Sequence, residues 1–267
     1  MIMDTLNTHL VAVARSLILS DVEKNRIATS ISTLQTRINS WFDNEVTKHF
    51  RFGSSVRETI LPRKVDEGSD IDYMVVFNNQ NQFKPATLLD KLRSFVNHYY
   101  SRSEIHQDHP TMVLELNHIK FELVPAYQTC SWSDYYNIPA PSTNYADWLL
   151  TNPSEIKRKV NDANIRYNYQ IKRLIRLLKY WNVRNYMVYS SFDLEDHIAG
   201  RTFYLCTTLE DYFFDAISGL PTDTLPQYKR DKVKKLQDKV SEIKDYYYTK
   251  GYKYLALEDL KDLFPIP

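Results

Sequence analysis

The stretch FGSSVRETILPRKVDEGSDIDYMVVF, residues 52–77, combines a Gly-Ser turn, a charged loop and an Asp-x-Asp pair that opens an apolar strand. Side chains of a strand alternate between its two faces, so Asp70 and Asp72 emerge side by side while Ile71 points the other way. Two carboxylates this close repel each other unless a cation lies between them. The pair therefore indicates either a Mg²⁺ site or, more simply, a polar turn that caps backbone N–H groups.

Gly53 and Ser54 make the first interpretation more specific. Glycine lets a backbone approach a ligand closely, and a serine at the start of a short helix offers its hydroxyl and free N–H groups to an anion. Taken alone, Ser54 is equally consistent with an ordinary helix cap. Together with Asp-x-Asp at the mouth of a strand, the turn indicates a site for a metal-bound phosphate.

A third carboxylate, Glu122, lies in the apolar run IKFELVPAY, residues 119–127. A charge in such a strand is costly unless it is paired or coordinates a metal. The alternative is a solvated face of the sheet, because Lys120 and Glu122 share a side. Glu115, in the preceding run MVLEL, competes for the same role.

The spacing of apolar residues predicts a mixed α/β part followed by a helical part. The expected strands are residues 71–77, 112–116 and 119–124, the last two forming a hairpin. The expected helices are residues 5–20, 21–49, 85–101, 143–151, 153–184, 191–218, 227–248 and 255–264. We therefore expect an α+β fold, with the N-terminal helices and a mixed-sheet lobe in residues 1–140 and a helical C-terminal lobe in residues 141–267.

The charge of the chain is balanced overall but unevenly distributed. There are 34 Lys and Arg against 33 Asp and Glu, yet residues 151–185 hold nine basic residues and only two acidic ones. In the segment YQIKRLIRLLKYW the apolar side chains recur at helical spacing, and the basic side chains are expected on other faces. This basic band is either a solvated helix face or a surface that meets phosphate.

Composition is typical of a soluble globular protein, with 43% hydrophobic and 25% charged residues. The two cysteines form no framework of repeated spacings, which favours a reducing cytoplasm. The N-terminus lacks the pattern of a signal peptide, and no apolar run approaches membrane-spanning length. Motifs for a Walker-type phosphate loop or a zinc site are absent from the sequence.

In their order and spacing, these motifs resemble the DNA polymerase β-like nucleotidyltransferases, whose signature is Gly-Ser, Asp-x-Asp and a distal acidic residue on a neighbouring strand. Within that superfamily the chain most resembles the cGAS/DncV-like nucleotidyltransferases (CD-NTases) of bacterial anti-phage signalling. Four further stretches carry the narrower resemblance: FELVPA, DWLLTNPSEI, LIRLLKYWN and YSSFDLEDHI. The chain departs from the family at Glu122, where the usual residue is Asp.

The resemblance implies an enzyme that joins NTPs, ATP among them, into a cyclic di- or trinucleotide second messenger of CBASS-type antiviral defence. Its active site would lie in the cleft between the two lobes, where a ribose hydroxyl attacks an α-phosphate and pyrophosphate leaves. Two Mg²⁺ ions, or Mn²⁺, would assist this displacement. The implied catalytic and metal-binding residues are Asp70, Asp72 and Glu122. The implied NTP-binding residues are Gly53, Ser54, Lys179 and Ser191.

A downstream effector would read the product, and neither a membrane nor nucleic-acid binding would be required. Two alternatives stay open: a transferase that adds nucleotides to RNA or protein, as in toxin–antitoxin systems, and a nucleotide binder without catalytic activity. The Val-Pro-Ala and Ser-Phe-x-Leu-Glu segments favour the cyclic product. Three intact acidic positions argue against an inactive binder.

Overall fold

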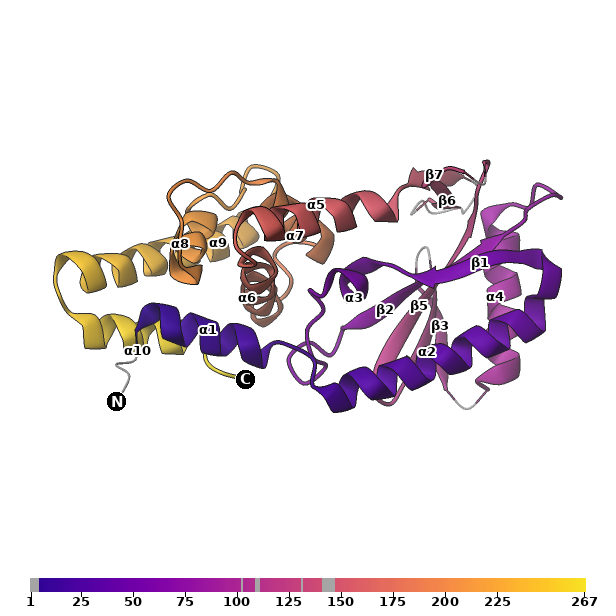
Figure 1. Cartoon of the computed structure of the whole chain (residues 1–267), viewed down its shortest axis with the longest axis horizontal. Helices are drawn as coiled ribbons and strands as arrows, with labels where there is room; N and C mark the ends of the chain where they lie inside the picture. The colour runs from indigo at the N-terminus through magenta and orange to yellow at the C-terminus, as the bar shows by residue number, and fades with distance from the viewer. Residues whose placement is uncertain (1–4, 102, 109–110, 131, 141–146) are drawn as a thin grey trace. The chain divides into compact units, whose positions relative to one another are not determined.

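The computed structural model describes residues 5–101, 103–108, 111–130, 132–140 and 147–267 (Figure 1). The chain forms two compact units. The first, called here the sheet unit, is Leu19–Arg158, and the second, the helical unit, combines Met1–Ile18 with Lys159–Pro267. The expected α+β class is therefore confirmed, with a mixed sheet in one unit and helices alone in the other.

The sheet unit is built on five strands in the order β1-β2-β5-β4-β3. Their bounds are β1 Val46–Arg51, β2 Asp70–Phe77, β3 Glu104–Asp108, β4 Thr111–Leu116 and β5 Ile119–Tyr127. Strands β2 and β5 run parallel, whereas the other neighbours in this order are antiparallel. Two short strands, β6 (Tyr136–Pro139) and β7 (Trp148–Thr151), extend the sheet from β5.

One face of this sheet packs against helices α2 (Asp21–Phe42) and α4 (Pro85–Tyr99). The side chains of Ile71, Tyr73 and Phe121 enter this core and are at most 1% exposed. Because strand residues alternate, the residues between them on β2 and β5 face the other side of the sheet. Burial of the apolar face thus decides which side chains the opposite face presents.

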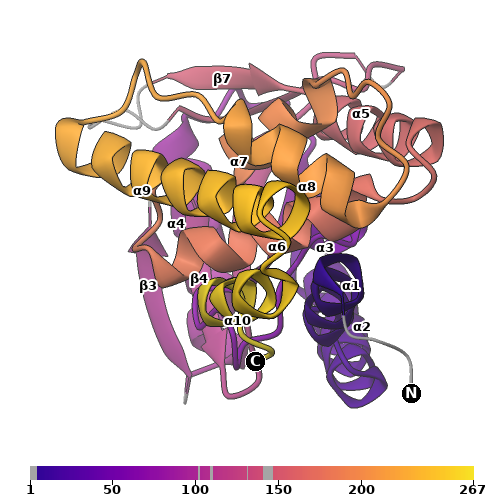
Figure 2. The ribbon, with the colours of Figure 1, turned by 90° about the vertical axis from the view of Figure 1, so that its left-hand side faces the viewer.

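The helical unit contains α1 (Leu6–Ser16) together with the helices of the C-terminal half. These are α6 Ile171–Arg184, α7 Ser191–Gly200, α8 Leu209–Ser218, α9 Gln227–Lys244 and α10 Lys253–Leu263, preceded by α5 (Pro153–Arg166), which begins in the sheet unit. Helix α1 packs against α6, α8 and α10, and Figures 1 and 2 both show it beside α10. His9 Nε2 lies 2.8 Å from the carbonyl oxygen of Phe264, which joins the two ends of the described chain.

The predicted boundary near residue 140 differs from the observed division. Strands β6 and β7 pair with each other and with β5, so residues 136–151 stay with the sheet, and the units separate after Arg158. The first helix was placed with the N-terminal lobe, but its buried Leu10 and Val13 lie in the helical unit.

Four predicted helices were also partly wrong: the helix expected at 153–184 is two helices, α5 and α6, and three others differ as follows. The helix expected to residue 49 ends at Phe42, because residues 46–51 pair with β2 as strand β1. The helix expected at 143–151 is strand β7 from Trp148, while residues 141–146 lie outside the described ranges. The helix expected at 191–218 is two helices, and Thr208 caps the second. In the first two of these three cases, pairing with a neighbouring strand overrides local helix propensity.

Within the described part of the chain, none of the helices is both long and apolar enough to cross a lipid bilayer.

We expect Leu10→Ala in α1 to lower the free energy of unfolding by about 2–5 kcal/mol, because it leaves a cavity in a fully buried site. Hydrogen exchange should accelerate in α6 and α8 and stay unchanged in β2 and β5. The matched control is Leu34→Ala in α2, also fully buried, for which the faster exchange should appear in the sheet unit. Faster exchange in the sheet strands of the Leu10 variant would contradict the assignment of α1.

Candidate active site

The parallel pairing of β2 with β5 brings the predicted carboxylates together. Asp70 is the register partner of Lys120, and Asp72 is the register partner of Glu122. All four side chains leave the sheet on the face opposite to the core of α2 and α4, since Ile71 and Phe121 fill that core. The structure thus places Asp70, Asp72 and Glu122 on one patch of two neighbouring strands.

Lys120 is the residue in this patch to which sequence reasoning assigned no role. Its Nζ lies 2.8 Å from Glu122 Oε1 and 3.5 Å from Asp70 Oδ2. The side chains of Asp70, Lys120 and Glu122 are 19–25% exposed, so water screens these charges only in part. The sequence feature that could have revealed this role is the i, i+2 spacing of Lys120 and Glu122. In a strand, this spacing places the ammonium on the same face as the carboxylates.

The carboxyl group of Asp70 is poorly suited to carrying a charge in this setting. Burial, followed by the negative charges of Asp72 and Glu122, raises the pKa of Asp70 to about 8, although Lys120 acts in the opposite direction. For Lys120, burial alone would lower the pKa, but the hydrogen bond and charge of Glu122, with Asp70, raise it on balance. The nearby ammonium of Lys120 therefore offsets only part of what opposes the ionisation of Asp70.

Position 53 requires a glycine, because the backbone there lies directly against the Asp72 side chain. Its φ of +69° lies in the left-handed region, and an added Cβ would stand 1.6 Å from Asp72 Oδ2. The neighbouring Phe52 N–H donates to the carbonyl oxygen of Asp72 over 3.0 Å. The Gly-Ser turn is therefore fixed against the second carboxylate, as a close backbone approach predicts.

Ser54 lies in the first turn of α3 (Gly53–Arg57), which packs on β2. Its carbonyl oxygen accepts from the Thr59 N–H over 3.0 Å. Among the described residues, its half-buried hydroxyl has no hydrogen-bond partner, so it is free to bind an added ligand.

Glu115 shares the acidic face but is held elsewhere. It is the register partner of Lys120 across β4 and β5, yet its Oε1 lies 2.6 Å from Arg63 Nη1. Arg63 also donates to the carbonyl oxygens of Leu116 and Glu67. The fixed pair with Arg63 distinguishes Glu115 from Glu122, whose partner is the flexible Lys120.

Lys179 and Ser191 belong to the helical unit. Ser191 begins α7, directly after its cap Ser190. Lys179 was expected beside the apolar stripe of its helix, but its side chain is only 5% exposed, and its Nζ donates to the fully buried Glu195 over 3.1 Å. The expectation of an exposed face is wrong for Lys179 and for Arg176, because α6 is enclosed on most sides by other helices.

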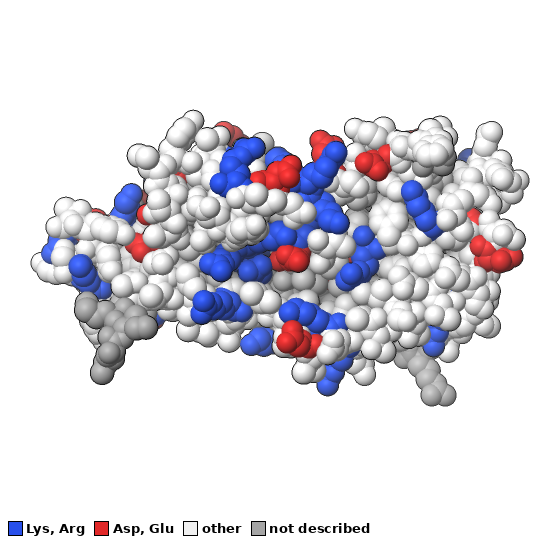
Figure 3. All heavy atoms as spheres, in the orientation of Figure 1, with Lys and Arg blue, Asp and Glu red and all other residues white. Residues whose placement is uncertain are grey.

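Other residues of the basic band, such as Lys157, Arg158 and Arg166, are exposed. Blue side chains outnumber red ones on the face of the helical unit that Figure 3 shows. Within the band, Arg176 and Lys179 on α6 are thus buried, whereas the other basic residues of α5 and α6 are half-buried or exposed.

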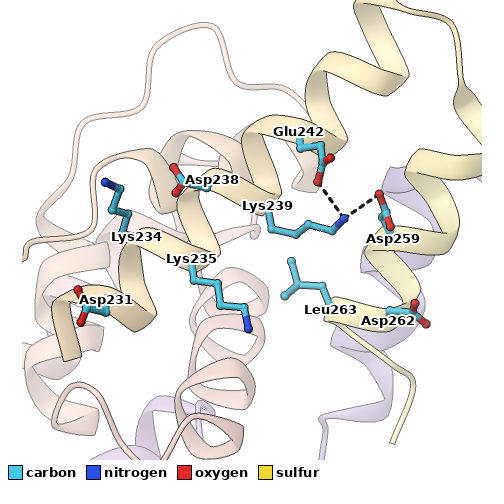
Figure 4. Close-up of a pocket in the computed structure, with 9 residues that line it drawn as sticks. All are labelled: Asp231, Lys234, Lys235, Asp238, Lys239, Glu242, Asp259, Asp262 and Leu263. Atoms are coloured by element: carbon cyan, nitrogen blue, oxygen red, sulfur yellow. Dashed lines mark hydrogen bonds and ion pairs between the residues drawn. The ribbon is translucent and has the colours of Figure 1, made fainter. Parts of the chain in front are cut away.

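Figure 4 shows a charged groove of about 990 Å³ between α9 and α10 of the helical unit. Lys239 Nζ lies 2.9 Å from Glu242 Oε2 and 3.0 Å from Asp259 Oδ2, so these groups neutralise one another. None of the predicted site residues lines this groove. The acidic patch of the sheet unit remains the candidate active site.

The donor atoms of the acidic patch suit a hard cation. Mg²⁺ prefers carboxylate oxygens together with water and phosphate oxygens, and Asp70, Asp72 and Glu122 supply such oxygens from two rigid strands. In the described ranges, however, no three acidic, histidine or cysteine side chains are already gathered as a metal site. The donor atoms of the patch therefore fit a metal ion. The cationic group that lies among them in this structure is the ammonium of Lys120.

Comparison with known families gives this patch its context. Residues 3–164, more than half of the chain, match the SMODS domain, described as the Second Messenger Oligonucleotide or Dinucleotide Synthetase domain. The chain belongs to the SMODS family. A probable cyclic nucleotide synthase of Bacillus cereus (strain VD146) is 28% identical over 181 residues, which are 54% of this SMODS chain and 53% of the relative. The chain thus matches about half the length of that curated relative.

Solved CD-NTase structures share the fold of this SMODS protein. DncV of Vibrio cholerae, a cyclic AMP-GMP synthase, has a TM-score of 0.78 at 12% identity, with 97% of this chain and 95% of that chain covered. CdnG of Bradyrhizobium diazoefficiens in complex with GTP has a TM-score of 0.72 at 11% identity, covering 97% and 98%. CdnC of E. coli MS115-1 has a TM-score of 0.70 at 14% identity, covering 97% and 96%. The predicted resemblance to the CD-NTases is confirmed.

We expect Gly53→Ala to destabilise the SMODS sheet unit by more than the strain of a left-handed alanine, which is about 1–2 kcal/mol. The added methyl group must displace the Asp72 carboxylate. Gly251→Ala is the matched control, because Gly251 has a φ of +75° and no atom within 4 Å of its added Cβ. Equal losses of unfolding free energy in urea would show that the Asp72 contact is unimportant.

The raised pKa of Asp70 predicts a pH-dependent stability. Between about pH 4 and 8 the unfolded chain ionises this carboxyl while the folded chain keeps its proton, so the contribution of Asp70 to stability falls as pH rises. We expect Asp70→Asn to stabilise the metal-free protein more at pH 8 than at pH 5. Urea unfolding in EDTA at both pH values measures this, and a difference independent of pH would contradict it.

Proposed function

We propose that this SMODS protein is a nucleotidyltransferase that joins NTPs, ATP among them, into a cyclic di- or trinucleotide second messenger, and that it acts in CBASS-type anti-phage signalling. The observation that carries the proposal is the register of β2 and β5, which pairs Asp72 with Glu122 beside Asp70. A Gly-Ser turn fixed against Asp72 adds a place for a phosphate. This combination suits chemistry at a metal-bound phosphate.

Each residue of the patch has a proposed role. Asp70, Asp72 and Glu122 hold Mg²⁺, proposed as two ions, with Mn²⁺ as a substitute. When bound, such ions activate a ribose hydroxyl and neutralise the charge of a triphosphate. The Ser54 hydroxyl and the backbone at Gly53 bind and orient the triphosphate, so that its α-phosphate lies in line with the attacking hydroxyl.

Lys179 and Ser191 are proposed as further triphosphate ligands from the helical unit. For Lys179 the burial changes the expected consequence of mutation. Replacing it by alanine would leave Glu195 buried without its ammonium partner, which costs about 3–5 kcal/mol when a buried pair is broken. Effects of Lys179→Ala on NTP binding therefore need correction for lost stability.

Similar proteins support the choice of substrates. The Bacillus cereus relative is described as a probable cyclic nucleotide synthase, and solved CD-NTase structures include CdnG with GTP and CdnC with ATP. For this chain we propose NTP substrates, a downstream effector that reads the product and no requirement for nucleic acid. Cys130 and Cys206 are both free, which supports a reducing cytoplasm.

The test incubates the protein with labelled NTPs and Mg²⁺, without any acceptor, and identifies the products by mass spectrometry. Wild-type protein should form a cyclic oligonucleotide and pyrophosphate. The double variant Asp70→Asn with Asp72→Asn should form none, while Glu122→Gln should still bind NTP but react slower by orders of magnitude, because a metal ligand is lost.

Glu115→Gln is the matched control, since its carboxylate lies on the same face but pairs with Arg63. It should keep the wild-type rate of product formation. Normal turnover by the folded double variant would refute the mechanism. In a parallel incubation with added RNA or protein, labelling of that acceptor without a cyclic product would instead favour a transferase of the toxin–antitoxin type.

A further inference from the structure

Lys120 lies among three carboxylates on which the proposed chemistry depends. Its ammonium is 2.8 Å from Glu122 Oε1 and 3.5 Å from Asp70 Oδ2, and its side chain is 19% exposed. It therefore bridges the carboxylates of two adjacent strands, as a bound cation would. The main-chain pairing of Asp70 with Lys120 places it there whenever the sheet is folded.

We propose that Lys120 is the built-in counter-ion of the acidic patch and that it competes with the divalent metal for the same carboxylates. This inference rests on the proposed function, because it concerns the same metal site. The ammonium stabilises the folded sheet before metal binds, and it withdraws when metal binds.

The need for a counter-ion follows from the charges on this face. The three carboxyl groups of this partly buried patch repel one another when they ionise, and taking their charges out of water adds a further cost. One ammonium at hydrogen-bonding distance offsets part of this cost. Without it, the strands β2 and β5 would pair with Asp70 and Glu122 lacking the ammonium that now lies between them.

The choice of lysine over arginine fits a counter-ion that must leave. Arginine binds carboxylates as a rigid fork, and on this same face Arg63 holds Glu115 at 2.6 Å with two further bonds to carbonyl oxygens. Lysine carries a point charge on a flexible four-carbon stem, which can turn toward solvent without moving the backbone. The face thus has one permanent pair, Arg63–Glu115, and one exchangeable cation.

If Lys120 competes with the metal, the wild-type protein should bind a divalent ion more weakly than a variant that has the same carboxylates but no ammonium at position 120. The probe is Mn²⁺ alone, without nucleotide, followed by electron paramagnetic resonance. Lys120→Met keeps the length of the stem and removes the charge. Because one positive charge within a few ångströms of the ion is lost, Lys120→Met should bind Mn²⁺ about tenfold more tightly or better.

Lys91→Met is the matched control. Lys91 belongs to the same unit and pairs with Glu45 on another part of it, so its loss changes the net charge by the same amount. Its Mn²⁺ affinity should stay within about twofold of wild type, since salt screens charges that are far from the ion. Lys120→Arg keeps the charge and should not gain affinity. Equal affinities for Lys120→Met and wild type would overturn the proposal.

The double variant Asp70→Asn with Asp72→Asn separates this proposal from the proposed function. If it loses the Mn²⁺ site while Lys120→Met matches wild type, the metal site stands and the competition fails. If neither wild type nor Lys120→Met binds Mn²⁺, the competition fails together with the metal-binding part of the proposed function.

A second measurement needs no variant. Acetylation of surface amines, read by mass spectrometry, reports how free each lysine is. Saturating Mn²⁺ should increase the labelling of Lys120 several-fold and leave Lys91 unchanged, because only Lys120 loses its carboxylate partners. Labelling of Lys120 that does not change with Mn²⁺ would overturn the proposal even if Lys120→Met fails to fold.

Discussion

The parallel pairing of β2 with β5 is the interaction on which the rest of the site depends. Its register is decided by the apolar side chains that fill the core under α2 and α4, among them Ile71 and Phe121. A slip by one residue would turn these side chains out of the core. The same slip would bury the carboxylates. Packing of the hydrophobic face therefore fixes the register that keeps the acidic side chains on the opposite face.

This arrangement gives the acidic face an electrostatic cost that the rest of the sheet offsets. Asp70 has a raised pKa because burial and two neighbouring carboxylates oppose its ionisation. Fully buried residues such as Tyr73 and Leu123 hold the same two strands together from the other side. The acidic patch is thus a local loss of stability on a strongly packed sheet, a cost that real proteins accept at functional sites.

Local periodicity was enough to predict which face of the sheet the acidic side chains share. The alternation of a strand placed Asp70 and Asp72 on one face, and the buried charge of Glu122 marked the second strand. It could not predict the parallel pairing, strands β1 and β7 or the burial of Lys179, because these depend on contacts between distant segments. Lys120 was visible beside Glu122, but its contact with Asp70 needs the register of both strands.

The membership of α1 in the helical unit has a consequence for biosynthesis. Leu6–Ser16 leaves the ribosome before its partners α6, α8 and α10, which follow only after the whole sheet unit has been made. The sheet unit is continuous in sequence and can fold as it emerges, since domains generally fold as units during synthesis. Helix α1 therefore keeps its apolar face uncovered while about 150 further residues are made, which takes roughly 8–30 seconds at 5–20 residues per second. During that interval it is a natural substrate for chaperones that bind nascent chains.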